Sequence, residues 1–267
     1  MAVGFQDEVV WITGGGSGLG RAMALEFASR GCRVVVSGRR LERLEDTVAA
    51  ATRAQGKVVA LTCDVTNEQE QAEALQTIVK QFGRLDVVVA NAGFSVDGRF
   101  ANLTSAQWRK QFETNVFGLV MTVQQALPEL SKTNGRIALI SSVASMISYP
   151  GGSAYGSSKA AVRSIGLCLS QELHGTGVSC TTIHPGFVES EIAKVSNDGV
   201  FDADKSDPRP AKLMWASDHA ARVMVRAIEK RKVEFIFTGH GHLFGFLGRH
   251  FPSLVHVLIT RFIGRTR

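Results

Sequence analysis

Short apolar runs rich in β-branched residues recur along the chain, and longer stretches of mixed apolar and polar residues separate them. Each run is apolar almost throughout and does not alternate, which is typical of strands buried on both faces of a sheet. The pattern therefore predicts a mostly parallel sheet of seven strands, with helices in the gaps. The expected strands span residues 9–12, 33–37, 58–62, 87–90, 136–140, 178–183 and 233–237.

Helix signals stand between the predicted strands. Thr66-x-x-Gln69 and Thr104-x-x-Gln107 have the spacing of a capping box, in which the threonine accepts a hydrogen bond from a backbone N–H at the helix start. A further helix is expected over 21–30. Right-handed crossovers between parallel strands then give a single doubly wound, Rossmann-type α/β domain with helices on both faces of the sheet. Ligands bind such a sheet at the carboxyl ends of its strands.

Length and composition narrow the class of protein. The chain has 267 residues, enough for one large domain, which we place at 1–240, followed by an apolar and basic extension at 241–267. The first ten residues lack the basic and apolar parts of a leader, so we expect a cytoplasmic and not a secreted protein. Four scattered cysteines and no clustered histidines predict neither a metal site nor disulfides. The net charge of +6 is spread along the chain, so no nucleic-acid partner is expected.

The extension combines large apolar residues with arginines. A helix that begins near Pro252 would carry one apolar stripe, although the run is too short to cross a bilayer. Three roles stay open: packing on the domain or on a second subunit of a homodimer or homotetramer, which we prefer, peripheral contact with a membrane surface, or the lining of a lipophilic entrance. The stripe comprises Leu247, Phe251, Leu254, Leu258 and Phe262, and the arginines are Arg249, Arg261, Arg265 and Arg267.

A glycine-rich turn, Thr13-Gly-Gly-Gly-Ser-Gly-Leu-Gly20, directly follows the first predicted strand. Glycine permits a tight turn and a close approach of backbone to a pyrophosphate, and the next helix offers unpaired N–H groups. The position between a strand and a helix predicts a dinucleotide site and not a flexible loop. The second strand ends at Gly38, where an NAD site would carry an acidic residue, and Arg39 and Arg40 follow. Unless these arginines only begin a solvated helix, they suit a 2′-phosphate, so NADP(H) is expected in preference to NAD(H).

Tyr155 and Lys159 stand four positions apart, and Ser142 lies thirteen positions before the tyrosine. A phenol has a pKa of about 10, so a catalytic tyrosine needs a nearby cation that stabilises its phenolate. At this spacing both side chains project from the same helix face, where the ammonium would lower the tyrosine pKa. The spacing alone also arises by chance in many helices.

With the glycine turn, Asn91-Ala92-Gly93, Asn115 and these three residues present in order, the chain resembles the short-chain dehydrogenase/reductase family over roughly residues 5–240. The resemblance implies that Tyr155 is the general acid in carbonyl reduction and the base in alcohol oxidation. Lys159 would lower the tyrosine pKa and bind the nicotinamide ribose, and Asn115 would bind a water that links Lys159 to solvent. Ser142 would orient the substrate oxygen, with Ser141 as a competing candidate.

The resemblance also implies the cofactor contacts and a reaction class. Apolar residues near the site suit a hydrophobic ketone, aldehyde or alcohol, although core packing explains them equally well. The stretch 196–210 is expected to be a mobile lid. The function expected is an NADP(H)-dependent oxidoreductase, and the alternative is a non-catalytic NADP(H)-binding regulator. Cofactor contacts are expected at Gly14, Ser17, Gly18, Leu19, Gly20, Asp64, Val65, Asn91, Ala92, Gly93, Pro185, Gly186 and Val188, and substrate contacts at Ser142, Phe94, Met146, Tyr149 and Phe187.

Overall fold

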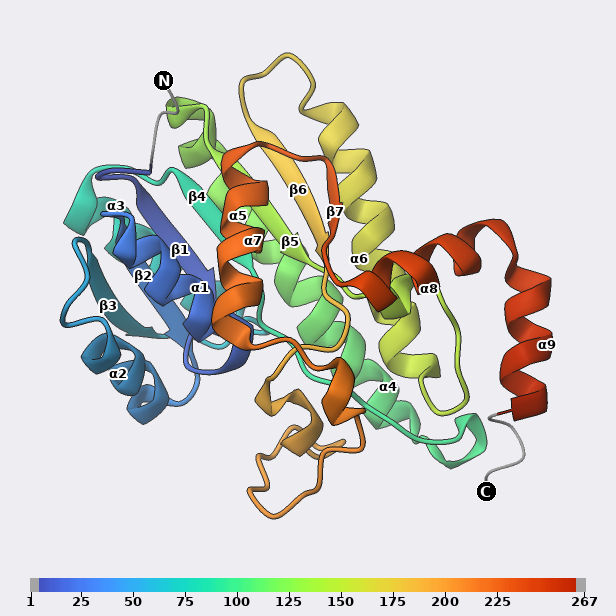
Figure 1. The fold of residues 1–267 in the computed structure, drawn as a ribbon. Helices are drawn as coiled ribbons and strands as arrows, with labels where there is room; N and C mark the ends of the chain where they lie inside the picture. Colours follow the sequence, from blue (N-terminus) through green and yellow to red (C-terminus); the bar gives the residue numbers. More distant parts are fainter. Residues whose placement is uncertain (1–4, 263–267) are drawn as a thin grey trace.

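A seven-stranded sheet lies at the centre of the computed structural model, which describes residues 5–262 (Figure 1). The strand order is β3-β2-β1-β4-β5-β6-β7, and every neighbouring pair is parallel. The predicted sheet and doubly wound fold are therefore confirmed. The strands are β1 Val9–Thr13, β2 Arg33–Gly38, β3 Lys57–Thr62, β4 Val87–Ala90, β5 Arg136–Ile140, β6 Ser179–His184 and β7 Glu234–Ile236.

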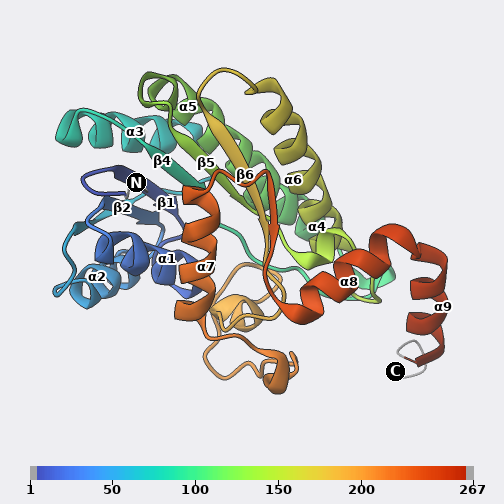
Figure 2. The same cartoon turned by 45° about the horizontal axis from the view of Figure 1, so that its top comes forward.

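Helices cover both faces of the sheet (Figures 1 and 2). Helices α1, α2 and α7 pack on one face, and α3, α5 and α6 pack on the other. Helices α8 and α9 follow β7 and extend away from the sheet. The helices are α1 Gly18–Ser29, α2 Leu41–Ala50, α3 Glu68–Phe82, α4 Ser105–Phe112, α5 Gly118–Thr133, α6 Ser153–Glu172, α7 Ser217–Glu229, α8 Gly239–His250 and α9 Pro252–Phe262.

The first strand shows why the strand sequences are apolar throughout. Val10 and Ile12 belong to the core under α1 and α7, whereas Val9 and Trp11 belong to the core under α5. All four side chains are fully buried. Because successive side chains of a strand point to opposite faces, a sheet covered by helices on both sides needs apolar residues at every position.

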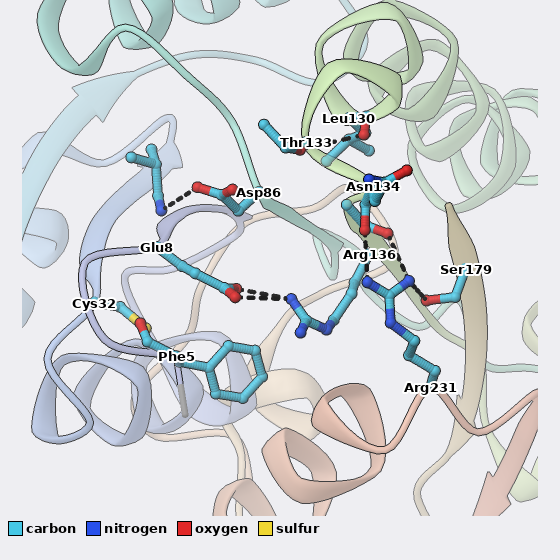
Figure 3. A network of polar contacts seen from close by, with 12 residues as sticks. Phe5, Glu8, Cys32, Asp86, Leu130, Thr133, Asn134, Arg136, Ser179 and Arg231 are labelled. Atoms are coloured by element: carbon cyan, nitrogen blue, oxygen red, sulfur yellow. Dashed lines mark hydrogen bonds and ion pairs between the residues drawn. The ribbon is translucent and has the colours of Figure 1, made fainter. Parts of the chain in front are cut away.

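Polar contacts tie the amino ends of the strands together (Figure 3). Arg136 at the start of β5 pairs with Glu8 at 2.8 Å, and the Asp86 carboxylate accepts a hydrogen bond from the first backbone N–H of β1. Arg231 donates to the Ser179 hydroxyl at 3.1 Å and to loop carbonyls beside it. These charged groups act on the loops before the strands, so they stabilise the edge of the sheet that is opposite to the expected ligand site.

One predicted helix cap is confirmed and the other is wrong. Thr104 forms the expected capping box with Gln107 at the start of α4. Helix α3 is instead capped by Asn67, whose side chain accepts from the backbone N–H groups of the first turn. Thr66 lies one position too early because its hydroxyl and its backbone N–H both donate to Asp64.

The predicted helix at Pro252 is present as α9, but it is the second helix of a bent pair. Helix α8 precedes it, and the two axes make an angle of 114°. Among the described residues no single helix has the length and hydropathy to cross a membrane. Of the described helices, only this bent pair, taken together, has the length and hydropathy required. Arg265 and Arg267 lie outside the described residues, and the side chain of Phe262 is not described.

Candidate active site

A cavity of about 600 Å³ opens at the carboxyl ends of the strands, where the strand order reverses between β1 and β4. Every residue that the sequence predicts as a cofactor contact lines it, from the glycine turn to Val188. Ser142 and Phe94 also line the cavity. Within residues 5–262, no group of three or more His, Cys, Asp or Glu side chains is arranged to hold a metal ion. Lining residues beyond the predicted contacts at single positions include Arg43, Ser190, Glu191, Phe201 and Arg209.

The glycine turn is shaped for close contact with a ligand. Gly14 has φ +67°, and a Cβ there would lie 2.8 Å from the Cα of Ala92, so a side chain is excluded. Asn91 fixes the turn from β4, because its side-chain amide donates to the carbonyls of Thr13 and Gly14 at 2.9 and 3.2 Å. Helix α1 begins at Gly18, three residues earlier than predicted. The Ser17 side chain makes no capping hydrogen bond, so the N–H groups of the first turn stay available for an anion.

Two arginines form a basic corner of the cavity at the end of β2. In this structure Glu191 bridges them, with Arg40 Nη2 at 3.1 Å and Arg43 Nη2 at 3.4 Å from its carboxylate oxygens. Both guanidinium groups lie over the Phe201 ring, at 5.4 and 5.6 Å from its centroid. Arg39 lines the same cavity. Arg43 stands three positions after Arg40 on α2, so helical spacing was a signal for it, whereas Glu191 and Phe201 come from distant segments.

Ser142 and Tyr155 meet at the other functional part of the cavity. Tyr155 lies in the first turn of α6, and the Ser142 side chain acts on its hydroxyl and lowers the tyrosine pKa. Ser142 Oγ also accepts from the Ala144 backbone N–H at 3.2 Å, which fixes its orientation. The competing candidate, Ser141, is buried and donates its hydroxyl hydrogen to the Lys159 carbonyl at 2.9 Å. The geometry therefore brings Ser142, and not Ser141, to the tyrosine.

Lys159 lies below the tyrosine on the same helix face. Its Nζ is 5.8 Å from the centroid of the Tyr155 ring and donates to the Ile140 carbonyl at 2.8 Å. Burial lowers the pKa of Lys159 to about 8, because the charged ammonium is poorly solvated there. A lysine with this pKa is mostly protonated at pH 7 and loses its charge as the pH rises through about 8.

The pKa of Tyr155 differs from the expectation. The sequence predicts a tyrosine pKa lowered by Lys159, but in this structure burial raises the pKa, and the lowering influence of the Ser142 side chain only partly opposes that rise. The negative charge of Asp97 raises the pKa further, and the positive charge of Arg209 lowers it. The tyrosine is therefore protonated at neutral pH, which is the state that a general acid requires.

Asn115 lies in a π-helical turn, Glu113–Phe117, between α4 and α5. Its side-chain amide is fully engaged: Oδ1 accepts from the Phe94 N–H at 3.1 Å, and Nδ2 donates to the Phe94 carbonyl and to Ser158. The side chain thus holds the segment after β4 against α6. The predicted binding of a water would have to use the main chain of Asn115, at a turn where the usual helical ladder is interrupted.

Three of the predicted substrate residues do not line the cavity. The Met146 sulfur lies 3.1 Å from the place where a Cβ of Gly245 would be, so this side chain packs under α8. Phe187 stacks on the His240 ring at 5.0 Å between centroids, and its backbone N–H donates to His240 Nε2 at 2.9 Å. Tyr149 is 40% exposed outside the cavity. The sequence did not predict α8, and Met146 and Phe187 both pack against this helix.

The predicted lid lies beside the cavity in this structure. Phe201 and Arg209, from the stretch 196–210, are among the residues that line it. Its Asp198 carbonyl accepts a hydrogen bond from Lys110 of α4, and its Asn197 side chain bonds the backbone of Asp97. These contacts attach the stretch to the segment after β4. Its movement stays a prediction.

Comparison with known proteins agrees with this arrangement. The family model of the short chain dehydrogenases matches residues 8–200. The serine 3-dehydrogenase of Agrobacterium fabrum is 32% identical over 241 residues, which are 86% of this chain and 96% of the relative. An uncharacterized oxidoreductase of Staphylococcus aureus is 32% identical over 230 residues, which are 85% of this chain and 98% of the relative.

Two solved structures share the fold. The alcohol dehydrogenase of the archaeon Thermococcus sibiricus, complexed with 5-hydroxy-NADP, has a TM-score of 0.75 and 25% identity, covering 87% of this chain and 97% of its own. Levodione reductase has a TM-score of 0.76 and 25% identity, covering 84% and 91%. The family model spans most of the chain, and the relatives match nearly their whole length. The chain therefore belongs to the short-chain dehydrogenase/reductase family and is an oxidoreductase of that type.

Proposed function

We propose that the chain is an NADP(H)-dependent enzyme that interconverts a ketone or aldehyde and an alcohol on a hydrophobic substrate. One observation carries this proposal: the pair of Ser142 and Tyr155 lines the same cavity as Arg39 and the basic corner of Arg40 and Arg43. The first group can hold a carbonyl oxygen, and the second can hold a phosphate.

The residues present fit a dinucleotide with a 2′-phosphate. The backbone N–H groups at the start of α1 suit the pyrophosphate, and the arginines after β2 suit the 2′-phosphate. Such a phosphate would replace Glu191 as the partner of Arg40 and Arg43. When bound, the nicotinamide of this cofactor supplies or accepts a hydride. The 5-hydroxy-NADP complex of the related alcohol dehydrogenase supports the assignment.

Proton transfer falls to Tyr155. In reduction its Oη–H gives its proton to the carbonyl oxygen of the substrate, and in oxidation the phenolate takes the proton of the alcohol. The Ser142 hydroxyl donates a hydrogen bond to the same oxygen and stabilises the charge that develops there. The Lys159 ammonium, below the tyrosine ring, stabilises the phenolate that forms.

The charges around the site favour an uncharged substrate. The carboxylate of serine, the substrate in the name of the Agrobacterium relative, would need a free cation near Tyr155. Arg209 lines the cavity, but all three of its guanidinium nitrogens already donate to Asp207 or to Val188 and Ser190. Asp97 also acts on the tyrosine with a negative charge. A neutral, mainly apolar ketone, aldehyde or alcohol fits this environment better.

A panel of substrates tests the function. Purified protein with NADPH and a series of ketones and aldehydes is expected to consume NADPH, with kcat/KM rising as the apolar part grows. Small hydroxy acids and serine, with NADP⁺, serve as the charged comparison. Absence of turnover over the whole panel, together with tight NADPH binding, would favour the non-catalytic regulator.

The rate of reduction is expected to fall as the pH rises through about 8, the pKa of Lys159. Above that pH the lysine loses the charge that stabilises the phenolate, whereas Tyr155 stays protonated because burial raises its pKa. The measurement is the pH profile of kcat at saturating NADPH and substrate. An alkaline limb at about 10 or higher would instead assign the titration to the tyrosine.

A further inference from the structure

Large apolar side chains are exposed along the whole of the helix pair α8–α9. Phe246 on α8 is 54% exposed, and Leu254 on α9 is 50% exposed. Figures 1 and 2 show α9 standing away from the rest of the domain in both views. A group of exposed large apolar side chains of this kind marks a contact with a partner or a membrane. We call it the tail surface, and it consists of Leu243, Phe246, Phe251, Leu254, Val257 and Leu258.

The spacing on α9 shows which side of the helix is turned to solvent. Leu254, Val257 and Leu258 occupy positions i, i+3 and i+4, which make one continuous stripe. All three are exposed, whereas Val255, outside that stripe, is buried. The helix thus keeps its larger apolar stripe on the outside, so this stripe does not pack on its own domain. Packing on a second subunit, the other form of the preferred expectation, stays untested.

Helix α8 fixes the pair to the domain. The Thr238 side chain caps it by accepting from the Gly241 N–H at 3.1 Å. Gly248 lies so close to the segment after β5 that a Cβ there would meet the Met146 carbonyl at 2.0 Å. The ion pair between Arg249 and Glu234, at 2.6 Å, joins the end of α8 to β7. The inner side of α8 is therefore held by the domain, and its outer side belongs to the tail surface.

Charge distinguishes the possible partners. No acidic residue follows Glu234 in the sequence, whereas four arginines do. Arg261 continues the α9 stripe one turn beyond Leu258 and is exposed. If two copies met through this surface around a twofold axis, basic side chains would face basic side chains without an acidic partner. Anionic lipid headgroups supply the charge that a second copy lacks.

We propose that the tail surface docks on an anionic lipid membrane. The two short helices lie in the interface, with their exposed apolar stripes among the upper acyl chains and Arg261 at headgroup level. Neither helix crosses the bilayer, consistent with the lengths of α8 and α9. An angle of 114° between the two axes is compatible with both helices lying in the plane of the interface.

Flotation with vesicles tests the proposal on the full chain. Wild-type protein is expected to float with vesicles of phosphatidylcholine and phosphatidylglycerol, at least about tenfold more than with phosphatidylcholine alone, and less as salt rises. Leu254→Asp with Leu258→Asp should lower flotation with anionic vesicles by about tenfold or more. Absence of flotation, or equal flotation with both kinds of vesicle, would overturn the assignment.

A matched variant controls for the added charge. Leu213→Asp with Val233→Asp adds the same charge at side chains that are 42% and 53% exposed, outside the tail surface and the cavity, against 50% and 41% for Leu254 and Leu258. It should float like the wild type, and circular dichroism should show the same helix content in all three proteins. Sedimentation velocity tests whether the partner is a second copy of the chain. If the wild type forms a dimer that does not bind vesicles, and the α9 variant is a monomer, the surface joins two copies and the membrane proposal is wrong.

Discussion

Replacement of Tyr155 by phenylalanine is expected to lower kcat for carbonyl reduction by about a hundredfold to ten-thousandfold and to leave the dissociation constant for NADPH unchanged. The substitution removes one oxygen atom and keeps the ring that packs in α6. The variant thus loses the proton donor and the group on which Ser142 acts. Steady-state kinetics and NADPH fluorescence titration measure the two quantities separately.

The chain offers a matched control for this variant. Tyr149 is the other of its two tyrosines, and it lies outside the cavity lining. Tyr149→Phe removes the same oxygen atom and should leave kcat within about threefold of the wild type. Full turnover by Tyr155→Phe would refute the proposed mechanism, and loss of NADPH binding would show that the tyrosine serves the structure of the site.

The fold was predictable because the information is local and repeated. An unbroken apolar run marks each strand in the sequence, because helices cover both faces of the sheet. The cap of α3 was harder to predict because Thr66 and Asn67 are adjacent and both suit an N-cap. Asp64 decides between them by engaging Thr66, and that contact is not visible in a pattern of capping residues.

The site was predictable where its residues come in short motifs, such as Gly14 to Gly20 or the run 91–93. Glu191 reaches Arg40 across 151 positions, so no spacing rule connects the two residues. The pKa of Tyr155 depends on its burial, a property of the folded chain, and burial is the largest influence on this pKa and raises it. Met146 and Phe187 lie against α8, which was not predicted, and outside the cavity lining, so their contact with a substrate stays a prediction.

The proposed preference for NADP(H) over NAD(H) rests on the basic corner. Arg39→Ala together with Arg40→Ala is expected to raise the KM for NADPH by about ten- to a hundredfold, since each lost charge-assisted hydrogen bond contributes about 1.5–3 kcal/mol before solvent screening. The KM for NADH should change by less than about threefold, because NADH carries no 2′-phosphate. Initial rates with each dinucleotide at saturating substrate give both values. A parallel double variant, Arg53→Ala with Arg99→Ala, removes two exposed arginines that do not line the cavity.

A variant of Glu191 is expected to shift the KM for NADPH in the opposite direction. In this structure its carboxylate forms ion pairs with the guanidinium groups of Arg40 and Arg43. The same carboxylate would repel a phosphate that approaches these groups. Glu191→Gln keeps the size of the side chain and should lower the KM for NADPH by about two- to tenfold, with little effect on NADH. Opposite shifts from the arginine and glutamate variants, confined to NADPH, are expected only if the phosphate binds at this corner. Equal shifts for NADPH and NADH would place the arginines in the structure of the cavity and remove the basis for an NADP(H) preference.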